Sequence, residues 1–156
     1  MIGRRFAVVF GLLALLHAVP PAVAQTHSQA DLRLVLKGYD PVAYFTDGKP
    51  TPGKAEFETV FDEGRYRFSS SGNMSLFRGD PEKYAPQFAG ACTNGLAQGV
   101  KLEADPTLWR IIDGKLFVFA GKSVPREMDS RPIRMIAKAR ENWTVLAHQP
   151  FIDLRH

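Results

Sequence analysis

Two stretches of alternating residues, each joined to its partner by a short turn, constrain the fold of this 156-residue chain most strongly. In residues 54–61 apolar side chains alternate with polar ones, and residues 65–68 alternate again after the turn Asp62-Glu63-Gly64. Asp113-Gly114 is a strong two-residue hairpin turn between two further apolar segments. A period of two indicates strands with one buried face, so we expect two β-hairpins.

Helix-start signals follow these hairpins. Serines at 69–71 can cap a short helix through Phe77, Asp80-Pro81 starts another, and Ser130 with Pro132 begins a C-terminal helix. The residues expected on the apolar face of that last helix are Ile133, Ile136, Ala137, Arg140, Trp143 and Ala147. We find no βαβ pattern and no internal repeat. The sequence therefore predicts an α+β fold: a small antiparallel sheet built from two β-hairpins, with short helices and a C-terminal amphipathic helix.

The first 24 residues have the three parts of a secretory signal peptide. Arg4 and Arg5 precede an apolar run at 6–19, and Ala22-Val23-Ala24 has the small-x-small pattern that signal peptidase cleaves. The run is shorter than the roughly 20 residues of a membrane-spanning helix. We therefore expect cleavage after Ala24 and a periplasmic or secreted protein with no stable membrane insertion. The expected organisation is a signal peptide at 1–24, a leader segment at 25–35, one domain at 36–147 and a C-terminal tail at 148–156.

Charge and cysteine content exclude several classes of protein. The chain has 20 Lys and Arg against 16 Asp and Glu, and two of the arginines lie in the expected signal peptide. No basic run is interleaved with aromatic residues, so we expect no nucleic-acid partner. Cys92 is the single cysteine, which rules out an intrachain disulfide. A lone thiol in an oxidising compartment is buried, bound to a metal, or paired with another molecule.

Six segments, taken in order, resemble the motifs of YHS-domain proteins. They are Gly38-Tyr39-Asp40-Pro41-Val42-Ala43-Tyr44-Phe45, Tyr66-Arg67-Phe68-Ser69-Ser70, Phe77 with residues 80–87, Gly90-Ala91-Cys92, Asp113-Gly114-Lys115-Leu116-Phe117, and residues 139–143. They cover about residues 36–144, so the chain resembles the exported bacterial members of that family. The resemblance implies a compact α+β, YHS-like domain at 36–147. Related short YHS domains accompany copper-transporting ATPases and some oxygenases and are thought to bind metal, which makes copper the first candidate cofactor.

Cys92 is the residue best suited to act as a soft metal ligand or a nucleophile. It lies in a glycine-rich stretch, where backbone amides can approach a thiolate; the alternative is a small buried hydrophobe. For a copper site, Met74 is the expected partner of Cys92. The remaining sulfur and imidazole donors are Met128, Met135, His27, His148 and His156. No two histidines are spaced as a pair, so the sequence contains no local metal motif.

Tyr39, Asp40, Tyr44 and Tyr66 form a second candidate group. Tyrosine hydroxyls beside a carboxylate can line a ligand pocket. The alternative is that Asp40 caps a turn and the tyrosines are half-buried sheet residues. No Ser-His-Asp arrangement and no phosphate-binding P-loop is recognisable, so no catalytic motif is visible.

These observations lead to three hypotheses. The first is a non-enzymatic periplasmic binding module for a metal ion, with copper as the first choice, or for a small ligand near Cys92. The second is a thiol-dependent redox protein or enzyme that uses Cys92. The third is a structural or protein-interaction domain. The sequence leaves the ligand, the partner and the oligomeric state open.

Overall fold

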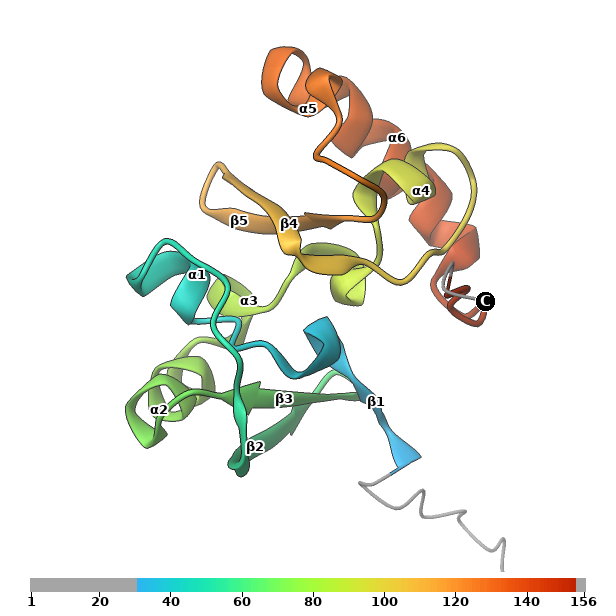
Figure 1. Cartoon of the computed structure of the whole chain (residues 1–156). Coiled ribbons are helices and arrows are strands. Elements are labelled where there is room, and N and C mark those ends of the chain that lie inside the picture. The colour runs from blue at the N-terminus through green and yellow to red at the C-terminus, as the bar shows by residue number, and fades with distance from the viewer. Residues whose placement is uncertain (1–30, 154–156) are drawn as a thin grey trace, which may run out of the picture.

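The computed structural model describes residues 31–153, and it confirms the α+β class (Figure 1). The elements are β1 (Arg33–Leu34), η2 (Val35–Gly38), α1 (Ala43–Thr46), β2 (Lys54–Phe61), β3 (Gly64–Phe68), α2 (Ser71–Gly79), α3 (Pro81–Tyr84), η3 (Gln87–Gly90), α4 (Thr93–Ala97), β4 (Asp105–Ile112), β5 (Lys115–Phe119), α5 (Arg126–Ser130) and α6 (Pro132–Leu146). The expected signal peptide lies outside the described residues. Within 31–153, no helix is long and apolar enough to cross a membrane.

Both expected hairpins are present, but they lie in two sheets. β2 and β3 pair antiparallel, and the short strand β1 adds a parallel neighbour to β3, which gives the order β1-β3-β2. β4 and β5 form a separate two-stranded antiparallel sheet above the first in Figure 1. Each hairpin is covered by its own helices, α2 on the first sheet and α4 on the second. The hairpins therefore bury their apolar faces without joining edge to edge.

The two hairpins have the same strand lengths and the same register shift. β2 and β4 both have 8 residues, and β3 and β5 both have 5. The register shifts at the same place in each hairpin, between Lys54 and Glu58 in the first and between Asp105 and Trp109 in the second. The third strand has a counterpart as well, because residue 86 forms a parallel bridge with β5 as β1 pairs with β3.

The turns that precede the hairpins repeat too. Residues 36–38 and 88–90 each place three consecutive residues in the left-handed region, with φ between 51° and 87°, and each run ends in glycine. In both turns the next residue donates its N–H to the carbonyl of the first left-handed residue at 3.0 Å. Asp40 and Cys92 come next, so they occupy equivalent positions. The backbone pattern thus repeats although the sequence shows no internal repeat, because different side chains occupy the corresponding positions.

We call residues 33–79 the first unit and residues 86–130 the second unit, and the two share one hydrophobic core. Phe68 and Phe77 of the first unit belong to the same buried cluster as Leu116 and Phe119 of the second. The contact also includes a polar bond, because the buried hydroxyl of Tyr44 donates to the carbonyl oxygen of residue 106 at 2.8 Å. The units are therefore halves of one domain.

The domain extends beyond the expected boundaries at both ends. β1 and Val35, which is 2% exposed, lie within the expected leader yet belong to the sheet and the core. At the other end, Ile152 donates its N–H to the carbonyl of Lys101 and accepts from the N–H of Glu103, both at 2.9 Å. The expected C-terminal tail is therefore paired with the second unit through residue 152, because residues 101–103 offer it unpaired backbone groups.

The buried face of α6 differs from the expected one. Ile133 is 77% exposed, and Ala137 and Arg140 also face solvent, whereas Ala139 is fully buried. The helix packs against α4, where Ala139 shares a buried cluster with Leu96, and Asn142 donates to the carbonyl of Leu96 at 2.7 Å. The residues that face the domain are Met135, Ile136, Ala139, Asn142, Trp143 and Leu146. Of these six residues, Ile136 and Trp143 belong to the expected face.

Candidate ligand pocket

Asp40 is a fully buried hydrogen-bond acceptor. One carboxylate oxygen accepts the N–H of Val42 at 2.9 Å, and the other accepts the N–H and hydroxyl of Ser69 at 2.8 and 2.7 Å and the amide of Asn73 at 2.7 Å. These donors come from the start of α1 and from the junction between β3 and α2. The carboxylate therefore joins the two parts of the first unit, as the turn-capping alternative expected.

Cys92 is the corresponding hydrogen-bond acceptor in the second unit. It precedes α4, and its Sγ accepts the N–H of Gly95 at 3.3 Å and the N–H of Ala120 at 3.0 Å. Ala120 follows β5 as Ser69 follows β3. The side chain is 1% exposed, which matches the alternative of a buried structural thiol. Cys92 thus fastens the start of α4 to the end of β5.

A cavity of about 520 Å³ lies where the two units meet. The first unit contributes residues of the turn before α1, and the second contributes the segment leading into β4 and the segment leaving β5. The lining residues are Lys37, Tyr39, Glu103, Asp105, Pro106, Ala120, Gly121 and Asp153. Because the amide of Ala120 is bonded to Cys92, the thiol lies directly behind the cavity wall. Tyr39 and Ala120, which are 81 positions apart, therefore meet at one site.

The cavity is rich in carboxylates. Glu103 pairs with Arg33 at 3.5 Å, and Asp105 accepts the N–H and the hydroxyl of Thr107 at 2.8 and 2.7 Å. The lining carries three carboxylates, on Glu103, Asp105 and Asp153, and the ammonium group of Lys37. With Arg33, the partner of Glu103, the carboxylates exceed the described cations by one. Burial raises the pKa of Tyr44, behind the cavity, and the neighbouring Tyr39 and carboxylates raise it further. Tyr44 therefore remains a neutral hydrogen-bond donor, and the net charge of the lining favours a ligand with a positively charged group.

The other tyrosines of the expected group do not share this cavity. Tyr44 is buried behind it, and Tyr66 lines a separate cavity of about 160 Å³ beside Phe88 and Trp143. Asp40 is occupied by the bonds within the first unit. Tyr39 is thus the member of the group that the structure places at the candidate site. Glu103, Asp105 and Asp153 were missed, because nothing in the sequence shows that their segments lie beside Tyr39.

The donors expected for copper are not brought together. Met74 lies on α2, which packs on the first sheet, whereas Cys92 precedes α4, which packs on the second sheet. Met128 is buried in the core, Met135 packs against it, and His148 is exposed; His27 and His156 lie outside the described residues. Among residues 31–153, no group of three or more His, Cys, Asp or Glu side chains is placed to hold a metal ion. The residues around Cys92 do not fit a copper centre.

A comparison with protein families identifies part of this architecture. The model of the YHS domain matches residues 42–88. The chain contains a YHS domain. The matched range runs from the start of α1 through the first sheet to η3, which is essentially the first unit and is narrower than the 36–144 suggested by the motifs. Neither the curated proteins nor the solved structures give a significant match. Most of the second unit lies beyond the YHS match, yet it repeats the same backbone design.

Proposed function

We propose that this YHS-domain protein is exported after cleavage at Ala24 and acts as a non-enzymatic binding module. Its ligand is a small molecule with a positively charged group, and it occupies the cavity between the two units. The observation that supports this function is the cavity itself, where Tyr39, the carboxylates and the segment bonded to Cys92 meet. Its volume of about 520 Å³ lies within the usual range of small-molecule sites.

Two other readings of Cys92 have less support. A metal site needs several donors around one point, and Cys92 accepts backbone amides instead. A catalytic or redox thiol needs access to its substrate, and Cys92 is 1% exposed. The small-ligand form of the binding hypothesis therefore agrees best with the geometry.

Three probes that share a phenyl ring and differ in charge test the proposal: phenethylamine, 2-phenylethanol and phenylacetate. Each is titrated into the purified protein while the backbone amide signals of Tyr39, Ala120 and Gly121 are followed by NMR. We expect phenethylamine to bind best and phenylacetate worst, because the lining carries more carboxylates than cations. Asp105→Asn should weaken phenethylamine binding, whereas Asp47→Asn, an exposed carboxylate on another loop, should leave it unchanged.

Two results would overturn the proposal. One is the absence of any probe-dependent shift at the cavity residues, with the fold intact by circular dichroism. The other is stoichiometric binding of Cu(I) that Cys92→Ser abolishes, which would restore the metal hypothesis.

A further inference from the structure

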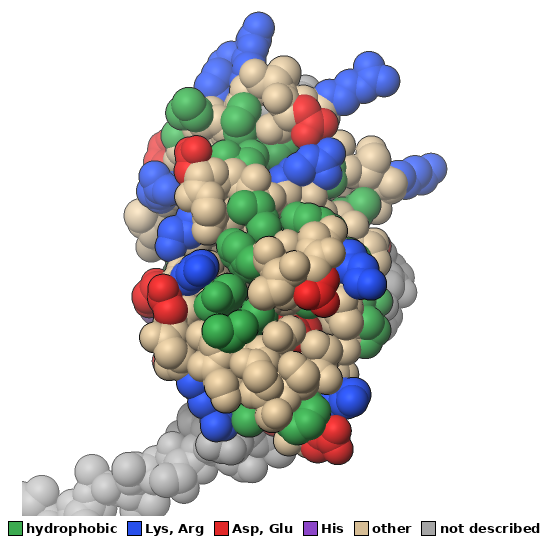
Figure 2. Space-filling model, turned by 90° about the vertical axis from the view of Figure 1, so that its left-hand side faces the viewer, with side chains coloured by type: hydrophobic (Ala, Val, Ile, Leu, Met, Phe, Trp, Pro, Cys, Tyr) green, Lys and Arg blue, Asp and Glu red, His purple; other side chains and the backbone are tan. Residues whose placement is uncertain are grey.

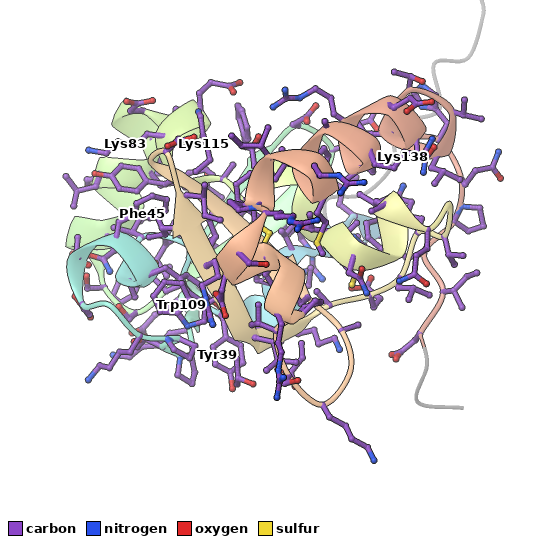
Figure 3. All side chains as sticks on the ribbon, turned by 90° about the horizontal axis from the view of Figure 1, so that it is seen from above. Tyr39, Phe45, Lys83, Trp109, Lys115 and Lys138 are labelled. Carbon is purple, nitrogen blue, oxygen red and sulfur yellow. The ribbon has the colours of Figure 1, made fainter. Side chains whose placement is uncertain are left out.

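A band of partly buried aromatic side chains leads away from the cavity along one face. Tyr44, which donates to the cavity residue Pro106, lies edge-on against Trp109 with ring centroids 5.3 Å apart. The next residue, Phe45, lies edge-on against Tyr84 of α3 at 5.4 Å. Tyr39, Trp109 and Phe45 follow one another along this edge in Figure 3, and we call these three residues the aromatic band. Figure 2 shows hydrophobic side chains gathered down the middle of this face.

The two ends of the aromatic band differ in charge. At the Tyr39 end lies the cavity with its carboxylates. At the Phe45 end lie two lysines: Lys83, whose ammonium is 4.9 Å from the centre of the Tyr84 ring, and Lys115, which donates to the carbonyl oxygen of Glu82 at 2.9 Å. Figure 3 shows both lysines on the same edge of the molecule as Phe45. A partner that lies along the band therefore meets negative charge at one end and positive charge at the other.

We propose that this face binds an extended peptide segment of another protein. A basic residue of the segment occupies the cavity, an apolar or aromatic residue lies on Trp109 and Phe45, and an acidic residue lies beside Lys83 and Lys115. The proposal rests on the proposed function of the cavity and specifies its ligand. An extended chain directs every second side chain to one face, so it can present all three groups together. It also supplies a protruding side chain to fill the cavity.

Four acetylated and amidated pentapeptides test this proposal. The first is Lys-Gly-Phe-Gly-Asp, whose three side chains alternate with glycine. The controls replace one group each: the acid in Lys-Gly-Phe-Gly-Lys, the base in Asp-Gly-Phe-Gly-Asp and the ring in Lys-Gly-Ala-Gly-Asp. Binding to the purified full-length protein is followed by NMR at the indole N–H of Trp109 and the amide of Gly121, with the indole of Trp143 as an internal reference. We expect the first peptide to bind several-fold more tightly than each control.

A charge-reversal variant checks the lysine end independently. Lys83→Glu should lower the affinity for the first peptide to that of the peptide that lacks the acid. It should leave phenethylamine binding in the cavity unchanged. Lys49→Glu, an exposed lysine in the loop after α1, is the matched control and should change neither.

The outcomes separate this proposal from the function on which it rests. Equal binding of all four peptides, or an unshifted Trp109 signal, overturns the peptide proposal even where phenethylamine still binds in the cavity. A concentration-dependent dimer that Phe45→Glu dissociates, without peptide binding, assigns the band to a second copy of the chain and also overturns it. Failure of both the probes and the peptides overturns the cavity function as well.

Discussion

At the scale of single residues, Asp40 and Cys92 occupy equivalent positions in the two units, one with a carboxylate and the other with a thiol. Each follows a left-handed turn, and each accepts one or more N–H groups at the start of the next helix and one N–H from the residue after the hairpin. A buried carboxylate needs more donors than a thiol does. Asp40 accordingly gains the Ser69 hydroxyl and the Asn73 amide, whereas Cys92 relies on the backbone.

Replacing Asp40 by Asn tests this account. The amide nitrogen would face N–H donors in place of an oxygen, so we expect Asp40→Asn to lower the free energy of unfolding by about 2–4 kcal/mol. Urea titrations at neutral pH measure the change. The exposed Asp47→Asn should stay within about 0.5 kcal/mol of the parent protein. A loss below about 1 kcal/mol in Asp40→Asn would contradict the assigned role.

Tyr66 makes stability depend on alkaline pH. Burial raises its pKa to about 12; Arg33 acts against this shift, and Asp62 and Glu82 add to it. The folded protein therefore holds this proton more tightly than the unfolded chain, whose tyrosines titrate near pH ~10. The contribution to stability is complete below pH ~10 and is lost as the pH rises toward 12. Unfolding free energies of the parent and Tyr66→Phe between pH 9 and 12 should show a shallower decline in the variant; parallel curves would contradict the prediction.

At the scale of elements, the contact between α4 and α6 depends on a small residue. Ala139 is fully buried against α4, and the helices are further joined by Asn142. The hydrophobic pattern of α6 indicated a different face, because Ile133 and Ala137 have helical spacing but point to solvent. Close packing between helices, rather than the number of apolar residues on a face, sets the rotation of α6.

A pair of substitutions on α6 distinguishes the two faces. Ala139→Leu should destabilise the protein by about 1–3 kcal/mol, because the added methyl groups meet α4 in a packed core. Ile133→Ala should change stability by less than about 0.5 kcal/mol, because Ile133 is 77% exposed. Thermal and urea unfolding measure both. The reverse order of effects would support the face read from the sequence.

At the scale of the whole molecule, two units of equal design share one core. Tyr44 and Trp109 pack across the boundary, and the buried cluster includes residues of both units. Neither unit buries its apolar face alone, since each contributes aromatic side chains to the other. The cavity exists for the same reason, because one wall comes from each unit.

A shared core predicts a single unfolding transition. Both tryptophans lie after residue 88: Trp143 reports on the second half of the chain, and Trp109 reports on its contact with Tyr44. Far-UV circular dichroism reports on both halves. We expect the two signals to change at the same urea concentration, as in a two-state domain. Separate midpoints would show that the units unfold independently.

Local structure could be predicted from the sequence wherever a few neighbouring residues set the conformation. The alternation at 54–68 and the Asp113-Gly114 turn predicted both hairpins, and Ser70 and Asp80 accept the helix N–H groups expected of caps. Tyr39 lines the cavity, and its role in binding a ligand stays a prediction. The export signal at 1–24 stays a prediction, since it lies outside the described residues.

By itself, the sequence determined the hairpins, the caps, the YHS resemblance and the candidacy of Tyr39, because each depends on residues close together in the chain. Only the tertiary structure decided the separation into two sheets, the equivalence of Asp40 and Cys92, and the meeting of Tyr39 with Glu103, Asp105 and Asp153. These features arise from contacts between distant segments, and a backbone repeat leaves no trace in the sequence when different side chains satisfy the same hydrogen bonds.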